Sequence, residues 1–382
     1  MSLTLNLDPA EFLDQAWQQQ PRLIRQAFPN FADLIEPEIL AGLALEEDVD
    51  SRVIIRHAEG WDVQHGPFES YDEFGQSGWT LLVQSVNEWL PEVQQLLAPF
   101  RFLPDWRLDD VMISFATENG GVGPHLDQYD VFIIQGLGRR HWQVGERLKN
   151  PKEFCPHPDL KQLSTPFEPI IDAILEPGDM LYIPAGCPHN GVGLEPSLNY
   201  SVGFRAPNMA ELGAAVADMI NHIETRPLPR FRDAHQSNYG PAHQVSAQQL
   251  TQLRNFLLSA WQQHDIDHAL MLVLSQSKRP LPTPAAPIHC DEFMQQFTDP
   301  TVFIARVPGA RMLLNPQQDR LYANGEDWEV TAELWPVAQW LGAMWEPAQL
   351  VQQAPLLQSA AAQQLCCDLI NCGVLDLYQQ HD

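Results

Sequence analysis

The chain has 382 residues, of which 45% are hydrophobic, so it is long enough to form two or three domains with substantial cores. Its formal net charge is -27 and its isoelectric point is near 4.6, so its field repels nucleic-acid phosphates and attracts cationic partners, although acidity also serves solubility. No apolar run follows a basic start, no stretch reaches membrane-span length, and six scattered cysteines form no Cys-x-x-Cys pair. We therefore expect a cytoplasmic protein with reduced thiols, no membrane contact and no direct nucleic-acid binding.

The N-terminal half reads as one short helix followed by strands. Asp8-Pro9 predicts a capped helix running through Phe12 and Trp17. Runs rich in β-branched and aromatic residues predict strands at Arg52–Ile55, Val111–Phe115, Val131–Ile134, Trp142–Val144 and Tyr200–Phe204. Together they indicate a double-stranded β-helix, a relative of the jelly roll, in an α+β protein, with this domain covering residues 1–207.

His125 and Asp127 lie two positions apart in a run, Val122–Ile134, that favours a strand. Residues two apart point the same way on a strand, so both side chains are expected on one face. His189 follows a Pro-Gly turn and the short apolar strand that ends at Pro184. Two imidazoles and one carboxylate form a facial triad that binds Fe(II) and leaves three adjacent positions open for a co-substrate and dioxygen.

Arg139 and Arg140 stand between the two parts of this triad. A Gly-Arg-Arg-His-Trp run is compatible with a solvated turn, but alternation along a strand sends the two arginines to opposite faces. One of them is therefore expected to point inward.

A second His-x-Asp pair, His157 and Asp159, competes with the first. It sits in a proline-bracketed stretch without an apolar strand, which favours a loop. Asp172 occupies the offset at which His125 has Arg140, so this pair has no cation at that offset.

The segment after residue 207 is predicted to be helical. Residues 208–225 are alanine-rich, and Ser246–Gln249 has the capping-box pattern ahead of a stripe formed by Leu250, Leu253, Leu257 and Trp261. The periodicity does not distinguish a partner-binding helix from one that packs on the chain's own core.

Four prolines between residues 280 and 287 predict a stiff linker. Beyond it, short strands at Val302–Val307, Met312–Leu314 and Asp319–Tyr322 precede the hairpin turn Asn324-Gly325 and helical patterns up to Gly373. The region 280–382 is thus a small α+β unit without a basic recognition stripe, which favours protein contacts over DNA.

Several motifs carry a more specific resemblance. Gly120–Asp130, Gly138–Arg140, Glu176–Asp179, Ile183-Pro184 and Asn199–Pro207, with further matches at Gly66–Tyr71, Pro104–Trp106 and Tyr322–Glu326, resemble the JmjC-type 2-oxoglutarate oxygenases. More narrowly, they resemble the bacterial ribosomal oxygenases, which hydroxylate an arginine of a large-subunit ribosomal protein. The likeness is close to full length and is weakest across residues 210–285.

The resemblance implies roles for particular residues. Fe(II) would be held by His125, Asp127 and His189, while Arg140 would make a bidentate fork to the distal carboxylate of 2-oxoglutarate and Ser114 would supply a hydroxyl partner. Ser114 is also compatible with a core serine bonded to backbone. Tyr129, Asn199 and Arg205 could line the substrate groove and are left unassigned.

It also implies an activity and partners. The expected enzyme is a 2-oxoglutarate-dependent dioxygenase, a ribosomal protein arginine 3-hydroxylase, that uses O2 and acts on a basic protein of the L16 type. Residues 208–279 would form a homodimer interface and residues 280–382 a winged-helix-like module. Two alternatives stay open: a JmjC-type N-methyl-lysine demethylase, and a non-catalytic cupin-like binding module.

Overall fold

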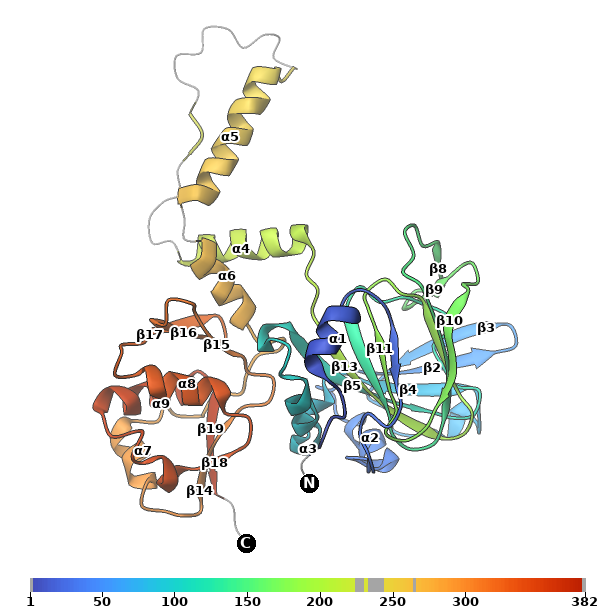
Figure 1. The fold of residues 1–382 in the computed structure, drawn as a ribbon, viewed down its shortest axis with the longest axis horizontal. Coiled ribbons are helices and arrows are strands. Elements are labelled where there is room, and N and C mark those ends of the chain that lie inside the picture. The colour runs from blue at the N-terminus through green and yellow to red at the C-terminus, as the bar shows by residue number, and fades with distance from the viewer. Residues whose placement is uncertain (1–2, 224–229, 233–243, 264–265, 380–382) are drawn as a thin grey trace. The chain divides into compact units, whose positions relative to one another are not determined.

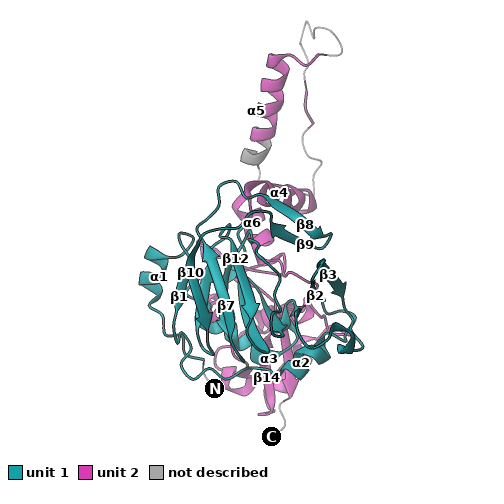
Figure 2. Ribbon diagram, turned by 90° about the vertical axis from the view of Figure 1, so that its right-hand side faces the viewer, with its two compact units in different colours: residues 1–206 teal, residues 207–382 magenta. Residues whose placement is uncertain are grey.

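The computed structural model describes residues 3–223, 230–232, 244–263 and 266–379 (Figure 1). The chain forms two compact units, Met1–Ala206 and Pro207–Asp382 (Figure 2). Among the described residues, no helix is long and apolar enough to cross a membrane.

The first unit is built on an eight-stranded sheet in the order β1-β11-β6-β13-β5-β4-β2-β3, with antiparallel neighbours throughout. The strands that the sequence predicts in this sheet are confirmed. Its members are β1 Arg22–Ile24, β2 Ser51–His57, β3 Gly60–His65, β4 Trp79–Val83, β5 Leu108–Ala116, β6 Asp130–Gln135, β11 Met180–Ile183 and β13 Ser197–Phe204.

A three-stranded sheet in the order β10-β7-β12 accompanies it, formed by β10 Pro169–Leu175, β7 Arg140–Gly145 and β12 His189–Gly193. Val131, Ile133 and Leu181 of the large sheet pack against Trp142 and Val144 of the small one. The two sheets therefore form the expected double-stranded β-helix. Helices at its periphery are α1 Pro9–Gln15, α2 Pro37–Leu43 and α3 Pro91–Gln94, with 3-10 turns at Asp72–Phe74, Val86–Glu88, Gln95–Phe100 and Asp105–Arg107.

The fold tests two local predictions, for the first helix and for the segment around His157. Asp8 caps α1 through hydrogen bonds from the Ala10 and Glu11 amides, as expected, although the helix ends before Trp17. The loop predicted around His157 is wrong, because a hairpin forms there from β8 Glu153–His157 and β9 Leu160–Leu163. Pro156 lies within β8 and does not prevent pairing, because both strands of a separate two-stranded sheet are edge strands, where proline is tolerated.

Strand register decides which side chains enter the interior. On the large sheet Ser114 is paired with Asn199 on one side and with Leu82 on the other, and Leu82 is paired with Arg52. These residues form one row across the sheet because partners in register share a face. The row brings polar groups into an otherwise apolar barrel.

The second unit begins with helices. α4 Met209–Ile223 packs on α6 Ile266–Ser275 through a core that includes Val216, Ala269 and Leu272. α5 Ala247–Gln263 starts at the predicted capping box, in which the Ser246 amide donates to Gln249 Oε1 at 2.8 Å and the Gln249 amide donates to Ser246 Oγ at 3.2 Å.

The rest of the second unit is a small α+β fold around a core of its own that includes Phe293, Leu341 and Leu369. The hairpin predicted at Asn324-Gly325 is confirmed. Its elements are α7 Cys290–Gln296, β14 Val302–Arg306, β15 Met312–Leu314, β16 Arg320–Ala323, β17 Glu326–Glu329, α8 Trp335–Ala343, β18 Ala348–Gln349, a 3-10 turn at Leu350–Gln353, α9 Ala360–Asn371 and β19 Leu375–Gln379.

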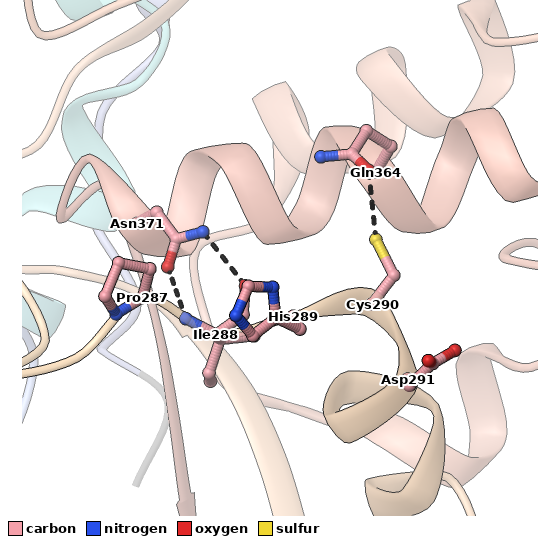
Figure 3. A pocket seen from close by; sticks show the side chains of 7 residues that line it. All are labelled: Pro287, Ile288, His289, Cys290, Asp291, Gln364 and Asn371. Carbon is pink, nitrogen blue, oxygen red and sulfur yellow. Dashed lines mark hydrogen bonds between the residues drawn. The ribbon is translucent and has the colours of Figure 1, made fainter.

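Figure 3 shows how the proline-rich linker ends on this fold. The side-chain amide of Asn371 accepts from the Ile288 amide at 2.8 Å and donates to the Ile288 carbonyl at 3.1 Å. The Cys290 thiol donates to Gln364 at 3.2 Å across a pocket of about 350 Å³. These contacts fix the start of α7 against α9.

Candidate metal centre and active site

His125, Asp127 and His189 come together as a cluster of potential metal ligands. One ligand atom from each lies within 4.8 Å of the other two, and His189 Nε2 is 3.6 Å from Asp127 Oδ2. Two imidazoles and a carboxylate are the donor set of a facial triad with open positions. The grouping expected from the sequence is therefore present.

The backbone that carries the first two ligands differs from the expectation. The strand predicted from Val122 begins only at Asp130, and His125 makes an isolated antiparallel bridge with His189. The His125 amide donates to the His189 carbonyl at 3.0 Å, and the His189 amide donates back at 2.8 Å. Asp127 is fixed by its carbonyl, which accepts from the Gly186 amide at 2.7 Å. A glycine-rich loop tied to β12 thus replaces the continuous strand.

Both imidazoles are oriented by backbone carbonyls two residues earlier in the chain. His125 Nδ1 lies 2.8 Å from the Gly123 carbonyl, and His189 Nδ1 lies 3.1 Å from the Cys187 carbonyl. A carbonyl only accepts, so each Nδ1 carries the proton and each Nε2 lone pair is free for a metal. Burial, followed by the neighbouring His125, lowers the pKa of His189 to about 4, which keeps this imidazole neutral near pH 7.

Arg140 is buried in the same cavity, while Arg139 is exposed and pairs with Glu195 at 2.9 Å, so the predicted alternation is confirmed. Arg140 Nη1 donates to Ser114 Oγ at 2.8 Å and Nε to Ser197 Oγ at 3.0 Å, while Nη2 donates to the Ser114 and Ser197 carbonyls at 2.7 and 2.8 Å. In the described part of the chain no carboxylate lies within 4 Å of this guanidinium. Burial lowers the pKa of Arg140 to about 9.

The triad and Arg140 line one cavity of about 480 Å³. Four buried polar atoms on its walls have no hydrogen-bond partner among the described residues. Buried polar groups without partners are uncommon in native proteins, and a bound ligand is one explanation for them. They are Arg52 Nε, Thr80 Oγ1, Trp142 Nε1 and Asn199 Oδ1.

Tyr129 stands at the rim of this cavity. The residue is 42% exposed, and the Asp127 carboxylate lies near its hydroxyl. Burial of that hydroxyl, followed by the negative charge of Asp127, raises the pKa of Tyr129 well above its ordinary value. The phenol is therefore a neutral hydrogen-bonding group beside the triad.

Some residues were placed less well by the sequence. Ser197 was missed, although it lies two positions from Asn199 on one strand and shares its face. Arg205 pairs with Asp109 at 3.2 Å and does not line the cavity. His157 and Asp159 contact each other at 3.9 Å, and Asp159 lies 3.3 Å from His65, but among the described residues these three do not form a cluster of mutually close ligand atoms.

Comparisons with known proteins identify the family to which the chain belongs. Residues 95–212 match the JmjC domain, and residues 259–376 match the ROXA-like winged helix. The chain is 46% identical to the ribosomal protein uL16 3-hydroxylase of Escherichia coli, over 85% of this chain and 87% of that protein. It is 31% identical to a probable ribosomal oxygenase of Haemophilus influenzae, over 84% and 82%.

A solved structure agrees with these sequence matches. YcfD, a ribosomal oxygenase from Escherichia coli in complex with cobalt and 2-oxoglutarate, superposes with a TM-score of 0.84 at 39% identity, covering 98% of this chain and 99% of that one. Fold and site together define a JmjC-domain protein. Within that class, the chain belongs to the bacterial ribosomal oxygenases, with a winged helix after the jelly roll.

Removal of the only anionic ligand should abolish metal binding at the triad. We expect Asp127→Ala to lose cobalt binding, measured by the visible absorption of Co(II), while its circular dichroism stays that of the wild type. His157→Ala, which alters the second His-x-Asp pair, should bind cobalt normally. Wild-type cobalt affinity in the Asp127 variant would contradict the assignment of the centre.

Proposed function

We propose that this protein is an Fe(II)- and 2-oxoglutarate-dependent oxygenase that hydroxylates an arginine of the ribosomal protein uL16 at carbon 3. The observation that carries the proposal is the joint presence, in one cavity, of an open triad and a buried arginine without a carboxylate partner. The close relationship to a uL16 3-hydroxylase supports the choice of substrate.

The residues present fit the metal. His125, Asp127 and His189 would hold Fe(II) through the two Nε2 atoms and one carboxylate oxygen, because both Nδ1 atoms are engaged by carbonyls. When bound, Fe(II) would activate O2, which is the oxidant: decarboxylation of 2-oxoglutarate to succinate and carbon dioxide would supply two electrons and take up one oxygen atom, and the other oxygen atom would go to the substrate. The protein's part is to orient these groups and exclude water.

Arg140 would hold the distal carboxylate of 2-oxoglutarate, with a change from the expected fork. Nε and both Nη2 hydrogens are bonded to protein acceptors, which leaves one N–H of Nη1. Ser114 Oγ accepts from Nη1, so its own hydroxyl hydrogen is available as a second donor. We propose that the carboxylate is bound by Arg140 Nη1 together with the Ser114 hydroxyl.

Loss of this buried cation should weaken co-substrate binding. We expect Arg140→Ala to cost about 2–5 kcal/mol in 2-oxoglutarate affinity, since a desolvated charge-assisted pair is removed. Arg140→Lys, which keeps the charge, should recover part of it. Arg139→Ala serves as the matched control and should bind normally, because Arg139 is exposed and faces away. An unchanged dissociation constant in Arg140→Ala would assign the carboxylate to another cation.

The charge of the chain supports a cationic substrate. A net charge of -27 attracts a basic ribosomal protein at long range and disfavours direct contact with nucleic acid. Glu153 and Asp159 of the β8-β9 hairpin line the same cavity as the triad. The six cysteines are free thiols, in keeping with the cytoplasmic location that we propose.

The reaction can be tested directly. A uL16 fragment containing the target arginine should gain one oxygen on that residue only when iron and 2-oxoglutarate are present, as read by tandem mass spectrometry. Binding of the fragment should weaken as salt is added, since screening reduces the long-range attraction. Oxygen on another residue type would overturn the arginine assignment. Turnover of methyl-lysine peptides alone, with formaldehyde release, would favour a demethylase.

We also propose that residues 208–279 form a homodimer interface and that residues 280–382 act as a separate protein-contact module. None of the described side chains of α5 is buried, and Leu250, Leu253 and Leu257 are 43–59% exposed on its apolar stripe. The side chain of Trp261 lies outside the described residues. An apolar helical face that stays exposed among the described residues is typical of a partner surface.

Charges on this stripe should prevent association. We expect the wild-type chain to be a dimer by light scattering at micromolar concentration, and the double variant Leu253→Asp/Leu257→Asp to be monomeric. Leu45→Asp, at a leucine that is 50% exposed outside this segment, is the control and should remain dimeric. A dimer that survives the double substitution would place the interface elsewhere.

A further inference from the structure

The β8-β9 hairpin contacts the loop that carries the first metal ligand. Gln162 of β9 is 4% exposed, and its Nε2 donates to the Val122 carbonyl at 2.7 Å. One residue on, the Leu163 amide donates to the Pro124 carbonyl at 2.8 Å. The hairpin therefore holds both sides of Gly123, two residues before His125.

Gly123 is the position through which this contact reaches the ligand. Its carbonyl accepts from His125 Nδ1 at 2.8 Å and so sets the rotation of the imidazole. Its backbone has φ of +79°, and a Cβ built there would lie 2.1 Å from Gln162 Nε2. Gln162 Nε2 thus packs against the α-carbon of Gly123, which joins the Val122–Gly123 peptide that it bonds to the next peptide, whose carbonyl orients the ligand.

We propose that Gln162 is a positioning residue for the metal centre: by fixing the Val122–Gly123 peptide, it aims the Gly123 carbonyl at His125 and thereby the His125 Nε2 lone pair at the metal. The inference rests on the proposed function only in taking the triad as the metal site. Groups that orient a ligating histidine typically change metal affinity or activity 10–100-fold when removed.

The chemistry of the contact explains why an amide occupies this position. A backbone carbonyl only accepts hydrogen bonds, so a buried partner must carry an N–H or O–H. Glutamate at residue 162 would set a carboxylate oxygen against the Val122 carbonyl, and leucine would leave that carbonyl without this partner. Both side chains are close to glutamine in size, so their effects report on the hydrogen bond more than on packing.

Neighbouring residues of the hairpin indicate why the contact lies here. Leu160 belongs to a hydrophobic cluster against which Val122 packs, and both Leu160 and Lys161 line the cavity that contains the triad. The strand that forms part of the cavity wall is therefore the strand that holds the ligand loop. Gln162 adds a side-chain hydrogen bond between the two, beside the backbone bond of Leu163.

The test uses the full chain and Co(II) alone. In Gln162→Glu and Gln162→Leu we expect the Co(II) dissociation constant to rise about 10–100-fold, and the visible Co(II) bands to shift at saturating metal because the His125 ring is reoriented. Gln143→Leu is the control: it removes the hydrogen bond from Gln143 of β7 to Asp172 of β10, which lies on the exposed side of the small sheet, and it should leave both readouts unchanged.

The thermal midpoint of the metal-free proteins separates positioning from stability. A Gln162 variant with a lowered midpoint but with wild-type Co(II) affinity and wild-type bands would overturn the proposal, because only the fold would then depend on the residue. If the other variants fail to fold, Gln162→Asn takes their place. It keeps an amide that is too short to reach Val122, so the same loss of Co(II) affinity is expected, and wild-type affinity would overturn the proposal. Failure of the wild-type chain to bind Co(II) would instead refute the metal centre itself.

Discussion

The pair of backbone hydrogen bonds between His125 and His189 is the constraint on which the site depends. It joins two ligands that are 64 positions apart in the sequence. Through it, the loop that carries His125 pairs with one edge of β12. On its other side β12 pairs with β7, where Gly193 is opposite Arg140 and His189 is opposite Val144. Four residues of strand, about 13 Å, therefore separate the levels of the metal ligand and the cation. A long arginine side chain and a five-carbon dicarboxylate are together suited to span that distance.

Glycine makes the close passage of the loop over β12 possible. A Cβ at Gly121 would lie 2.4 Å from the Gly191 carbonyl oxygen, and one at Gly191 would lie 2.7 Å from the Trp142 ring. A larger residue at Gly121 would push the loop away from β12 and so lengthen the His125–His189 bonds, whereas one at Gly191 would displace the Trp142 ring of β7. The glycine-rich sequence before His125 is thus a packing requirement of the metal centre.

Sequence reasoning located the chemistry better than the backbone that carries it. The triad and the inward arginine could be predicted because residue type, a two-residue spacing and strand alternation are local signals. The continuous strand through His125 was wrong because β-branched composition does not reveal which neighbour a segment pairs with. Ser197 and Gln162 act through contacts 57 and 40 residues away, so no local period marks them. The hairpin at His157 depends on pairing with β9, which the prolines concealed.

The environment of Arg140 links stability to ligand choice. A buried charge is costly unless it is paired, and four hydrogen bonds to serine side chains and carbonyls stabilise the guanidinium without neutralising it. The lowered pKa of Arg140 reflects this incomplete compensation. In a chain with 49 acidic residues, keeping every carboxylate beyond 4 Å of this group in the described structure leaves its positive charge without an anionic partner. An anion that enters completes the charge pair, so its binding free energy adds to the stability of the folded state. The same arrangement rejects neutral ligands, because they would leave the cation unpaired at the end of the cavity.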